Sequence, residues 1–165
     1  MKLSRLFRHL LLPDWWVQRA FSRADLAAIG DAVAAGETSH RGELRFVVEG
    51  PLPLSALWRG MSARARAVEV FAAQRVWDTA ENSGILIYVQ LVDHKVEILA
   101  DRGIAARVSQ AEWEAICRAM EASFRRGEWR QGALQAVTRA GELLVRHFPA
   151  GEVNLNELPD QPVVL

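Results

Sequence analysis

Apolar positions repeat with periods of two and of about 3.6 along most of the chain, and these periods predict strands and helices. Residues 84–92 form a nearly continuous apolar, β-branched run, which is typical of a strand covered on both faces. Residues 95–100 alternate apolar and polar side chains, and Asp93-His94 predicts a tight turn between the two runs. We therefore expect an antiparallel hairpin, with its first strand central in a sheet and its second nearer an edge. Residues 43–49 predict another strand.

Helical spacing predicts four further elements, over residues 22–36, 62–77 and 109–126 and from Trp129 to just before Pro149. Ser22 and Ser109 each precede an acid by three residues, which is the spacing of a capping box. For residues 62–77 we expect the inward positions to be Ala65, Val68, Ala72 and Val76. The order of these elements predicts an α/β fold, a three-layer α-β-α sandwich with a small mixed sheet.

The sequence divides into a basic aromatic leader (residues 1–21), a domain (22–149) and an extended C-terminal tail (150–165). Apolar residues at 3, 6, 7, 10 and 11 form one face of a predicted helix in the leader, with cations on or near the other side. Two interpretations remain open. The leader lies on a membrane surface, or it packs on its own domain or a partner. In either case the contacts are expected from Arg5, Arg8, Trp15 and Trp16.

Composition narrows the function classes. The 20 Lys and Arg residues balance 20 Asp and Glu residues, so a nucleic-acid partner is not expected. Cys117 is the single cysteine, which excludes an intramolecular disulfide, and its neighbours predict a buried thiol. The N-terminal apolar run is interrupted by Arg8 and His9, unlike a signal peptide, and no stretch approaches the ~20 apolar residues of a membrane span. We expect a cytoplasmic protein that associates peripherally with the inner membrane face.

Polar side chains at both ends of the predicted hairpin define a candidate ligand crevice. Asp78, Glu81 and Asn82 precede its first strand, and Asp101 and Arg102 follow its second. Carboxylate and amide oxygens are ligands for calcium or another divalent cation, so Glu81 and Asp101 are the candidate metal ligands. The alternative is structural: Asn82 serves as a turn residue, and Asp101 pairs with Arg102 or caps the next turn.

Catalytic motifs are sparse. The chain has no Cys-x5-Arg loop, no Asp-x-Asp motif and no clustered set of His and Asp ligands. Its four histidines, at positions 9, 40, 94 and 147, are far apart and are expected to be solvated. Phosphatase chemistry would have to rely on a metal-activated water and on Arg102 as the cation beside the phosphoryl group.

Several segments resemble the TPM domain, a family named for a thylakoid-lumen protein, a photosystem II repair protein and a modulator of acetylcholine receptors. The resemblance rests on residues 82–88, on the segment Ala-Asp-Arg-Gly-Ile at 100–104, on Trp113 and on residues 124–127, and it extends over residues 20 to 149. It implies a small mixed sheet between helices. It also implies one of three roles: an acid phosphatase, a calcium-binding protein, or an adaptor in membrane-protein quality control. The chain resembles a cytoplasmic bacterial-type branch of that family.

Two functional hypotheses follow. The first is a non-catalytic binding or scaffold module that acts beside a protein partner, such as a membrane protein, in envelope maintenance, with weak contact to the membrane surface. The second is a divalent-metal-dependent acid phosphatase that uses the predicted crevice.

Overall fold

The apolar run at residues 84–92 forms the centre of a four-stranded sheet in the computed structural model, which describes residues 3–13, 15–151 and 156–165. The strand order is β3-β2-β1-β4. Strand β2 pairs antiparallel with β3 and parallel with β1, and β4 runs parallel to β1. The predicted hairpin and the mixed sheet are therefore confirmed. The strands are β1 (Leu44–Glu49), β2 (Ile85–Gln90), β3 (Lys95–Ala100) and β4 (Val163–Val164).

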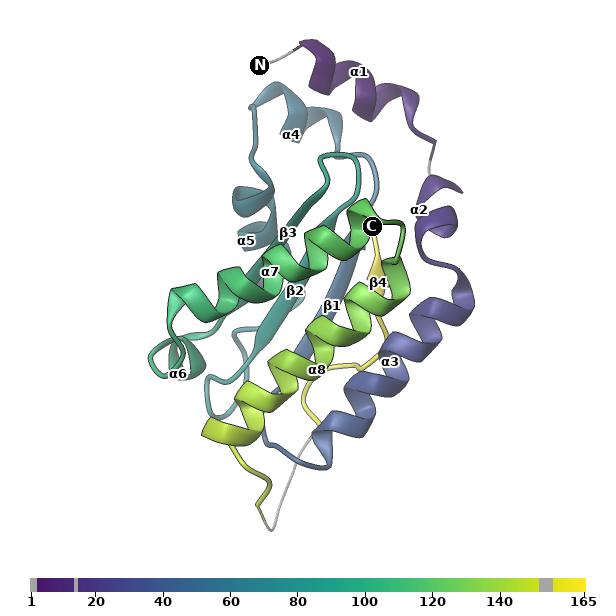
Figure 1. Cartoon of the computed structure of the whole chain (residues 1–165). Coiled ribbons are helices and arrows are strands. Elements are labelled where there is room, and N and C mark those ends of the chain that lie inside the picture. The colour runs from purple at the N-terminus through teal and green to yellow at the C-terminus, as the bar shows by residue number, and fades with distance from the viewer. Residues whose placement is uncertain (1–2, 14, 152–155) are drawn as a thin grey trace.

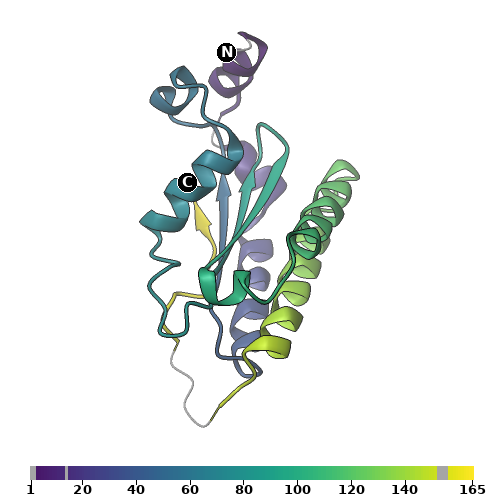
Figure 2. The ribbon, with the colours of Figure 1, turned by 90° about the vertical axis from the view of Figure 1, so that its left-hand side faces the viewer.

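Helices account for the other two layers (Figures 1 and 2). Helices α3, α7 and α8 cover one face of the sheet, and α5 lies on the opposite face. This arrangement confirms the predicted α-β-α sandwich. The helices are α1 (Leu3–Leu11), α2 (Trp15–Ala20), α3 (Arg23–Glu37), α4 (Leu54–Trp58), α5 (Ala63–Ala73), α6 (Arg102–Ala105), α7 (Gln110–Arg125) and α8 (Trp129–His147).

The alternation of the strands divides the core in two. In β1, Phe46 and Val48 face α3, α7 and α8, whereas Val47 faces α5. In β2, Ile87 and Tyr88 separate in the same way, and every residue of the strand is buried. A strand covered on both faces explains why this segment reads as a continuous apolar run.

Local sequence signals set the helix ends. Ser22 and Ser109 form complete capping boxes with Asp25 and Glu112, as predicted. Gly127 follows α7 with a φ of +79°, a left-handed conformation that glycine adopts without a steric penalty. The short helices α4 and α6 were not predicted, because four or five residues are too few to show a helical period.

The predicted inward face of the helix after Ser62 was wrong at three of its four positions, and only Val76, beyond the end of the helix, is buried as predicted. Helix α5 ends at Ala73 and buries Ala63, Ala67 and Val70, whereas Ala65 and Val68 are exposed. This rotation places Arg66 beside the sheet, where its guanidinium reaches the buried carboxylate of Glu49. Apolar spacing alone did not predict which face of α5 is buried, and in the observed orientation an ion pair joins this helix to the sheet.

The C-terminal residues are part of the sheet. Leu165 N donates to Val48 O at 2.9 Å, and Leu158 is buried against the α5 face. Glu43 holds this segment by accepting hydrogen bonds from the backbone N–H groups of Glu157 and Leu158 at 3.0 and 3.1 Å. Arg45 donates to Gln161 O at 2.9 Å. The extended segment thus supplies an edge strand, which is too short to give a periodic signal.

None of the helices in the described part of the chain is long and apolar enough to cross a membrane.

Candidate functional site

The antiparallel pairing of β2 and β3 brings the predicted crevice residues to one corner of the sheet. Ile85 pairs with Ala100, so Asn82 just before β2 lies beside Asp101 and Arg102 just after β3. Arg102 Nε donates to Asn82 Oδ1 at 2.8 Å, and Asp101 N donates to Gly84 O at 2.8 Å. The corner therefore exists as a set of direct contacts between segments about twenty residues apart.

Backbone approach at this corner is unusually close. Gly103 N donates to Asn82 O at 2.9 Å, and a Cβ atom at Gly103 would lie 2.5 Å from Glu81 O. A Cβ at Gly84 would lie 1.9 Å from Val76 O. Both glycines are needed for packing, and Asn82 itself has a φ of +53°, which asparagine tolerates better than most residues.

The two other predicted residues point to different partners. Glu81 Oε1 forms an ion pair with Arg41 Nη1 at 2.5 Å, so its charge is already balanced. Asp78 lies in an exposed turn closed by the bond from its N–H to Arg75 O. The structure therefore joins Asn82, Asp101 and Arg102 directly, joins Glu81 to them only through the backbone, and leaves Asp78 apart.

The donor set at this corner does not fit a divalent cation. Asp101 Oδ1 accepts a hydrogen bond from Arg102 N at 2.7 Å, and Asn82 Oδ1 is bound to the Arg102 guanidinium. Asp101 Oδ2 and Ser83 Oγ are buried and have no hydrogen-bond partner among the described residues. Two such oxygens fall short of the six to eight that calcium takes. Across residues 3–13, 15–151 and 156–165, no group of three or more His, Cys, Asp or Glu side chains is placed to hold a metal.

We expect Asp101 to matter for stability, because it is the N-cap of α6. Asp101→Ala removes the acceptor for Arg102 N and should lower the free energy of unfolding by about 1 kcal/mol. Asp101→Asn keeps a side-chain oxygen and should recover most of that loss. Urea unfolding of the two variants measures the difference. Equal losses would show that the carboxylate charge matters and that capping does not.

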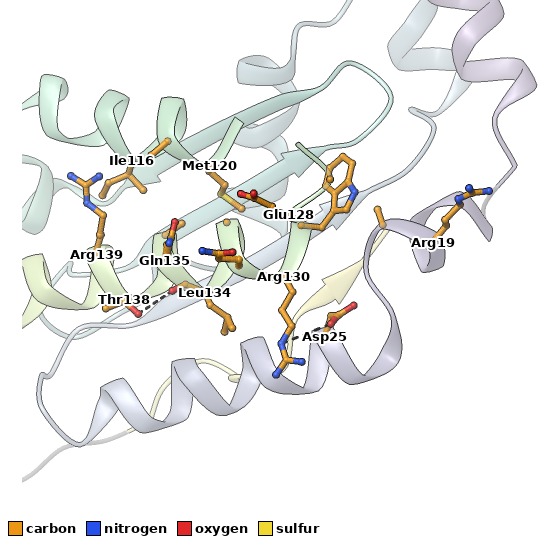
Figure 3. Close-up of a pocket in the computed structure, with 17 residues that line it drawn as sticks. Arg19, Asp25, Ile116, Met120, Glu128, Arg130, Leu134, Gln135, Thr138 and Arg139 are labelled. Atoms are coloured by element: carbon orange, nitrogen blue, oxygen red, sulfur yellow. Dashed lines mark hydrogen bonds and ion pairs between the residues drawn. The ribbon is translucent and has the colours of Figure 1, made fainter. Parts of the chain in front are cut away.

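A large hollow lies elsewhere on the surface, over the N-terminal half of α8 (Figure 3). Its volume is about 790 Å³. The spacing of the α8 residues places them on two sides of the helix: Arg130, Leu134 and Thr138 point toward α3, whereas Gln135 and Arg139 point toward α7. Ile116 and Met120 of α7 line the second side. Sequence reasoning missed this hollow because apolar spacing shows which face of a helix is buried, and not where neighbouring helices leave a gap.

The rim of the hollow carries more free cations than free acids. Asp25 accepts hydrogen bonds from Ser22 and lies 3.9 Å from the Arg130 guanidinium, and Glu128 is paired with Arg126. Arg19 and Arg139 are exposed, and neither has an ion-pair partner within the described residues. The hollow thus combines an apolar floor with a cationic edge.

The leader residues have separate environments. Trp16 packs on the main core and meets the ring of His94 edge-on at 6.3 Å, whereas Trp15 is largely exposed. Arg5 forms a bidentate pair with Asp93, and Arg8 is exposed. The leader is therefore fixed on the domain at some positions and open to solvent at others.

Two of the four histidines contradict the expectation of solvation, because His9 and His40 are each only 3% exposed. Burial lowers the pKa of both. His9 Nδ1 accepts a hydrogen bond from Leu52 N at 3.0 Å, and its Nε2 lies 3.2 Å from Asp93 Oδ1. The lone thiol of Cys117 is partly buried, and burial raises its pKa to about 11, so it is a poor nucleophile at neutral pH.

The fold and the corner define a mixed α/β sandwich with a hairpin closed by an Ala-Asp-Arg-Gly-Ile segment. The sequence model of the TPM domain matches residues 17–143, and the chain belongs to that family. The BA42 protein of the psychrophilic bacterium Bizionia argentinensis, solved by NMR, is 28% identical with a TM-score of 0.77, covering 88% of this chain and 95% of that one.

The N-terminal domain of the cg2496 protein from Corynebacterium glutamicum has a similar fold. It is 14% identical with a TM-score of 0.55, over 83% of this chain and 81% of that one. A search of curated proteins gave no match.

Proposed function

We propose that this TPM domain is a non-catalytic binding module that acts beside a membrane-protein or envelope-maintenance partner. The hollow over α8 carries the proposal. Its apolar floor, which includes Met120 and Leu134, suits the apolar side chains of a protein segment. The unpaired Arg19 and Arg139 on its rim suit acidic residues that flank such a segment. The partner is therefore expected to present apolar anchors next to Asp or Glu.

The polar corner favours the same conclusion over phosphatase chemistry. Arg102, the cation that would face a phosphoryl group, donates to Asn82, and Glu81 is paired with Arg41. These groups already satisfy one another. A phosphatase would need to release them before they could bind substrate, whereas a binding module uses them to fix the hairpin.

Site-specific photo-crosslinking in cells that express the chain naturally tests the proposal. A photoreactive residue at Leu134 in the hollow should give one defined adduct, and one at Ala72, exposed on α5 across the sheet, should not. Mass spectrometry should place the adduct in a partner segment rich in apolar and acidic residues. Arg139→Glu should abolish the adduct. The matched change Arg118→Glu, in an exposed arginine of α7 outside the hollow, should leave it intact.

Two results would contradict the proposal. One is an adduct that forms equally from Ala72 or survives Arg139→Glu. The other is hydrolysis of an aryl phosphate by the purified chain that requires a divalent cation and disappears in Asp101→Ala, which would support the phosphatase alternative.

A further inference from the structure

Helix α1 is mounted on the domain by its polar side. Arg5 donates to both carboxylate oxygens of Asp93, with the closest pair of atoms at 2.7 Å, and the buried His9 one turn later contacts the same carboxylate. His9 Nδ1 also accepts from Leu52 N. Because Asp93 belongs to the turn between β2 and β3, these contacts attach α1 to the tip of the hairpin. Arg5 and His9 are on the polar side of α1, the side that an amphipathic helix normally exposes to solvent, and here that side faces the domain.

The apolar side of α1 consequently faces outward. Leu3, Phe7, Leu10 and Leu11 are each more than half exposed, and Leu11 reaches 76%. Their spacing of four, three and one residues places them on a single stripe. Only Leu6 packs inward, on the small cluster of Leu52, Ala56 and Leu57. Burying this stripe in water-free surroundings would be favourable, yet the domain leaves it uncovered.

Helix α4 also leaves large apolar side chains exposed. It lies next to α1 at one end of the molecule, and Leu6 of α1 packs on the cluster of Leu52, Ala56 and Leu57, to which α4 contributes two residues (Figures 1 and 2). Leu54 and Trp58, one turn apart on α4, are exposed, Trp58 at 71%. We call the six exposed apolar side chains the apolar tip: Leu3, Phe7, Leu10, Leu11, Leu54 and Trp58.

The charges around the apolar tip are positive. Arg8 on α1 and Arg59 at the end of α4 are exposed, and neither helix carries an acid. The acids near these two helices already have cationic partners. Asp93 is paired with Arg5, and Glu69 is paired with Arg66 at 2.9 Å and more loosely with Arg59 at 3.6 Å. An apolar surface flanked by cations is complementary to a bilayer with anionic headgroups, and the indole of Trp58 suits the headgroup level.

We propose that the apolar tip docks on an anionic lipid bilayer. The apolar side chains of α1 and α4 enter the boundary between headgroups and acyl chains, while Arg8 and Arg59 contact anionic headgroups. Because the Asp93 contacts hold α1 helical and oriented before binding, insertion requires no folding of the segment. This inference goes beyond the proposed function and does not depend on the hollow over α8, which lies on another part of the surface.

Co-sedimentation of the full chain with vesicles tests the inference. The chain should sediment with phosphatidylcholine vesicles containing about one third phosphatidylglycerol, and much less with pure phosphatidylcholine or in high salt. The double variant Phe7→Asp, Trp58→Asp should lower the partition coefficient by about tenfold or more. The matched double variant Val68→Asp, Val145→Asp makes the same changes at exposed apolar positions of α5 and α8 and should bind like the unchanged chain.

Circular dichroism and urea unfolding of both double variants check that the variants are folded, so that a loss of binding can be distinguished from a loss of folding. Equal sedimentation of the two double variants, or of the unchanged chain with anionic and neutral vesicles, would overturn the inference. So would a concentration-dependent dimer that only the tip variant abolishes and that does not bind vesicles, because the surface would then join two copies of the chain. If no photo-crosslinked adduct forms from Leu134 while the chain still binds vesicles, the result counts against the proposed function alone.

Discussion

Arg66→Ala should lower the free energy of unfolding by about 3–5 kcal/mol, the range for removing one partner of a buried ion pair. Glu49 is 2% exposed, and the Arg66 guanidinium contacts both of its carboxylate oxygens, at 2.7 to 3.0 Å. The only other side-chain donor to this carboxylate among the described residues is the Tyr88 hydroxyl. Without Arg66, the buried charge of Glu49 lacks compensation, and the attachment of α5 to the sheet weakens.

The neighbouring Arg64 supplies the control. It lies on the same helix, is half exposed, and contacts Glu97 at 3.5 Å and Ile98 O at 2.8 Å. Arg64→Ala should cost about 1 kcal/mol or less, as exposed pairs do. Urea unfolding of both variants at neutral pH compares them. Equal losses for the two arginines would show that the Glu49 pair contributes little.

Raising the pH from 5.0 to 8.5 should weaken the attachment of the C-terminal segment. Burial, followed by the neighbouring Asp160, raises the pKa of Glu37 from 4.5 to about 8. Asn156 donates to both Glu37 and Asp160 at 2.9 Å, and the buried Glu43 faces the same segment with its pKa also raised, chiefly by burial. The folded chain thus keeps a proton on Glu37 across a pH range in which the unfolded chain has lost it.

The direction of this pH effect follows from the number of protons that the folded and unfolded states bind. Between pH 4.5 and about 8 the folded state binds more protons at Glu37, so stability is fully present below pH 4.5 and falls as the pH rises toward 8. We expect a loss of about 1–2 kcal/mol, less than the full shift implies, because the group is only partly buried and is screened by solvent.

Glu37→Gln removes the titrating group and should flatten this profile, whereas Glu142→Gln, exposed on α8, should not. Urea unfolding at each pH gives the stability. The exchange rate of the Leu165 amide proton, which bonds to Val48 O, reports the attachment of β4 after correction for intrinsic exchange. Identical profiles for Glu37→Gln and the unchanged chain would contradict the assignment.

The local elements were accessible from the sequence. Capping boxes at Ser22 and Ser109, the glycine after α7 and the apolar run of β2 are signals within a few residues, and the structure reproduces each of them. The contact between the segments around Asn82 and Asp101 could also be inferred, because a tight hairpin forces the start of its first strand to meet the end of its second. The role of that corner as a ligand crevice stays a prediction.

Other features depended on partners distant in sequence. The buried face of α5 was mispredicted because it depends on the ion pair of Arg66 with Glu49, which joins this helix to the sheet. His9 was expected in solvent, yet it is buried because Leu52 and Asp93, more than forty residues away, supply its hydrogen bonds. The hollow over α8 depends on the gaps among three helices, which no single helix encodes.

By itself, the sequence determined the elements, the mixed sheet between helices and the TPM family, because periodicity, caps and a local motif act over a few residues. It also showed that the first helix is amphipathic. Only the tertiary structure decided which side of α1 faces the domain: the Asp93 carboxylate at the hairpin tip binds Arg5 and His9 and so turns the leucines outward. The direction of an amphipathic helix depends on the surface it meets, and that surface exists only once the sheet has formed.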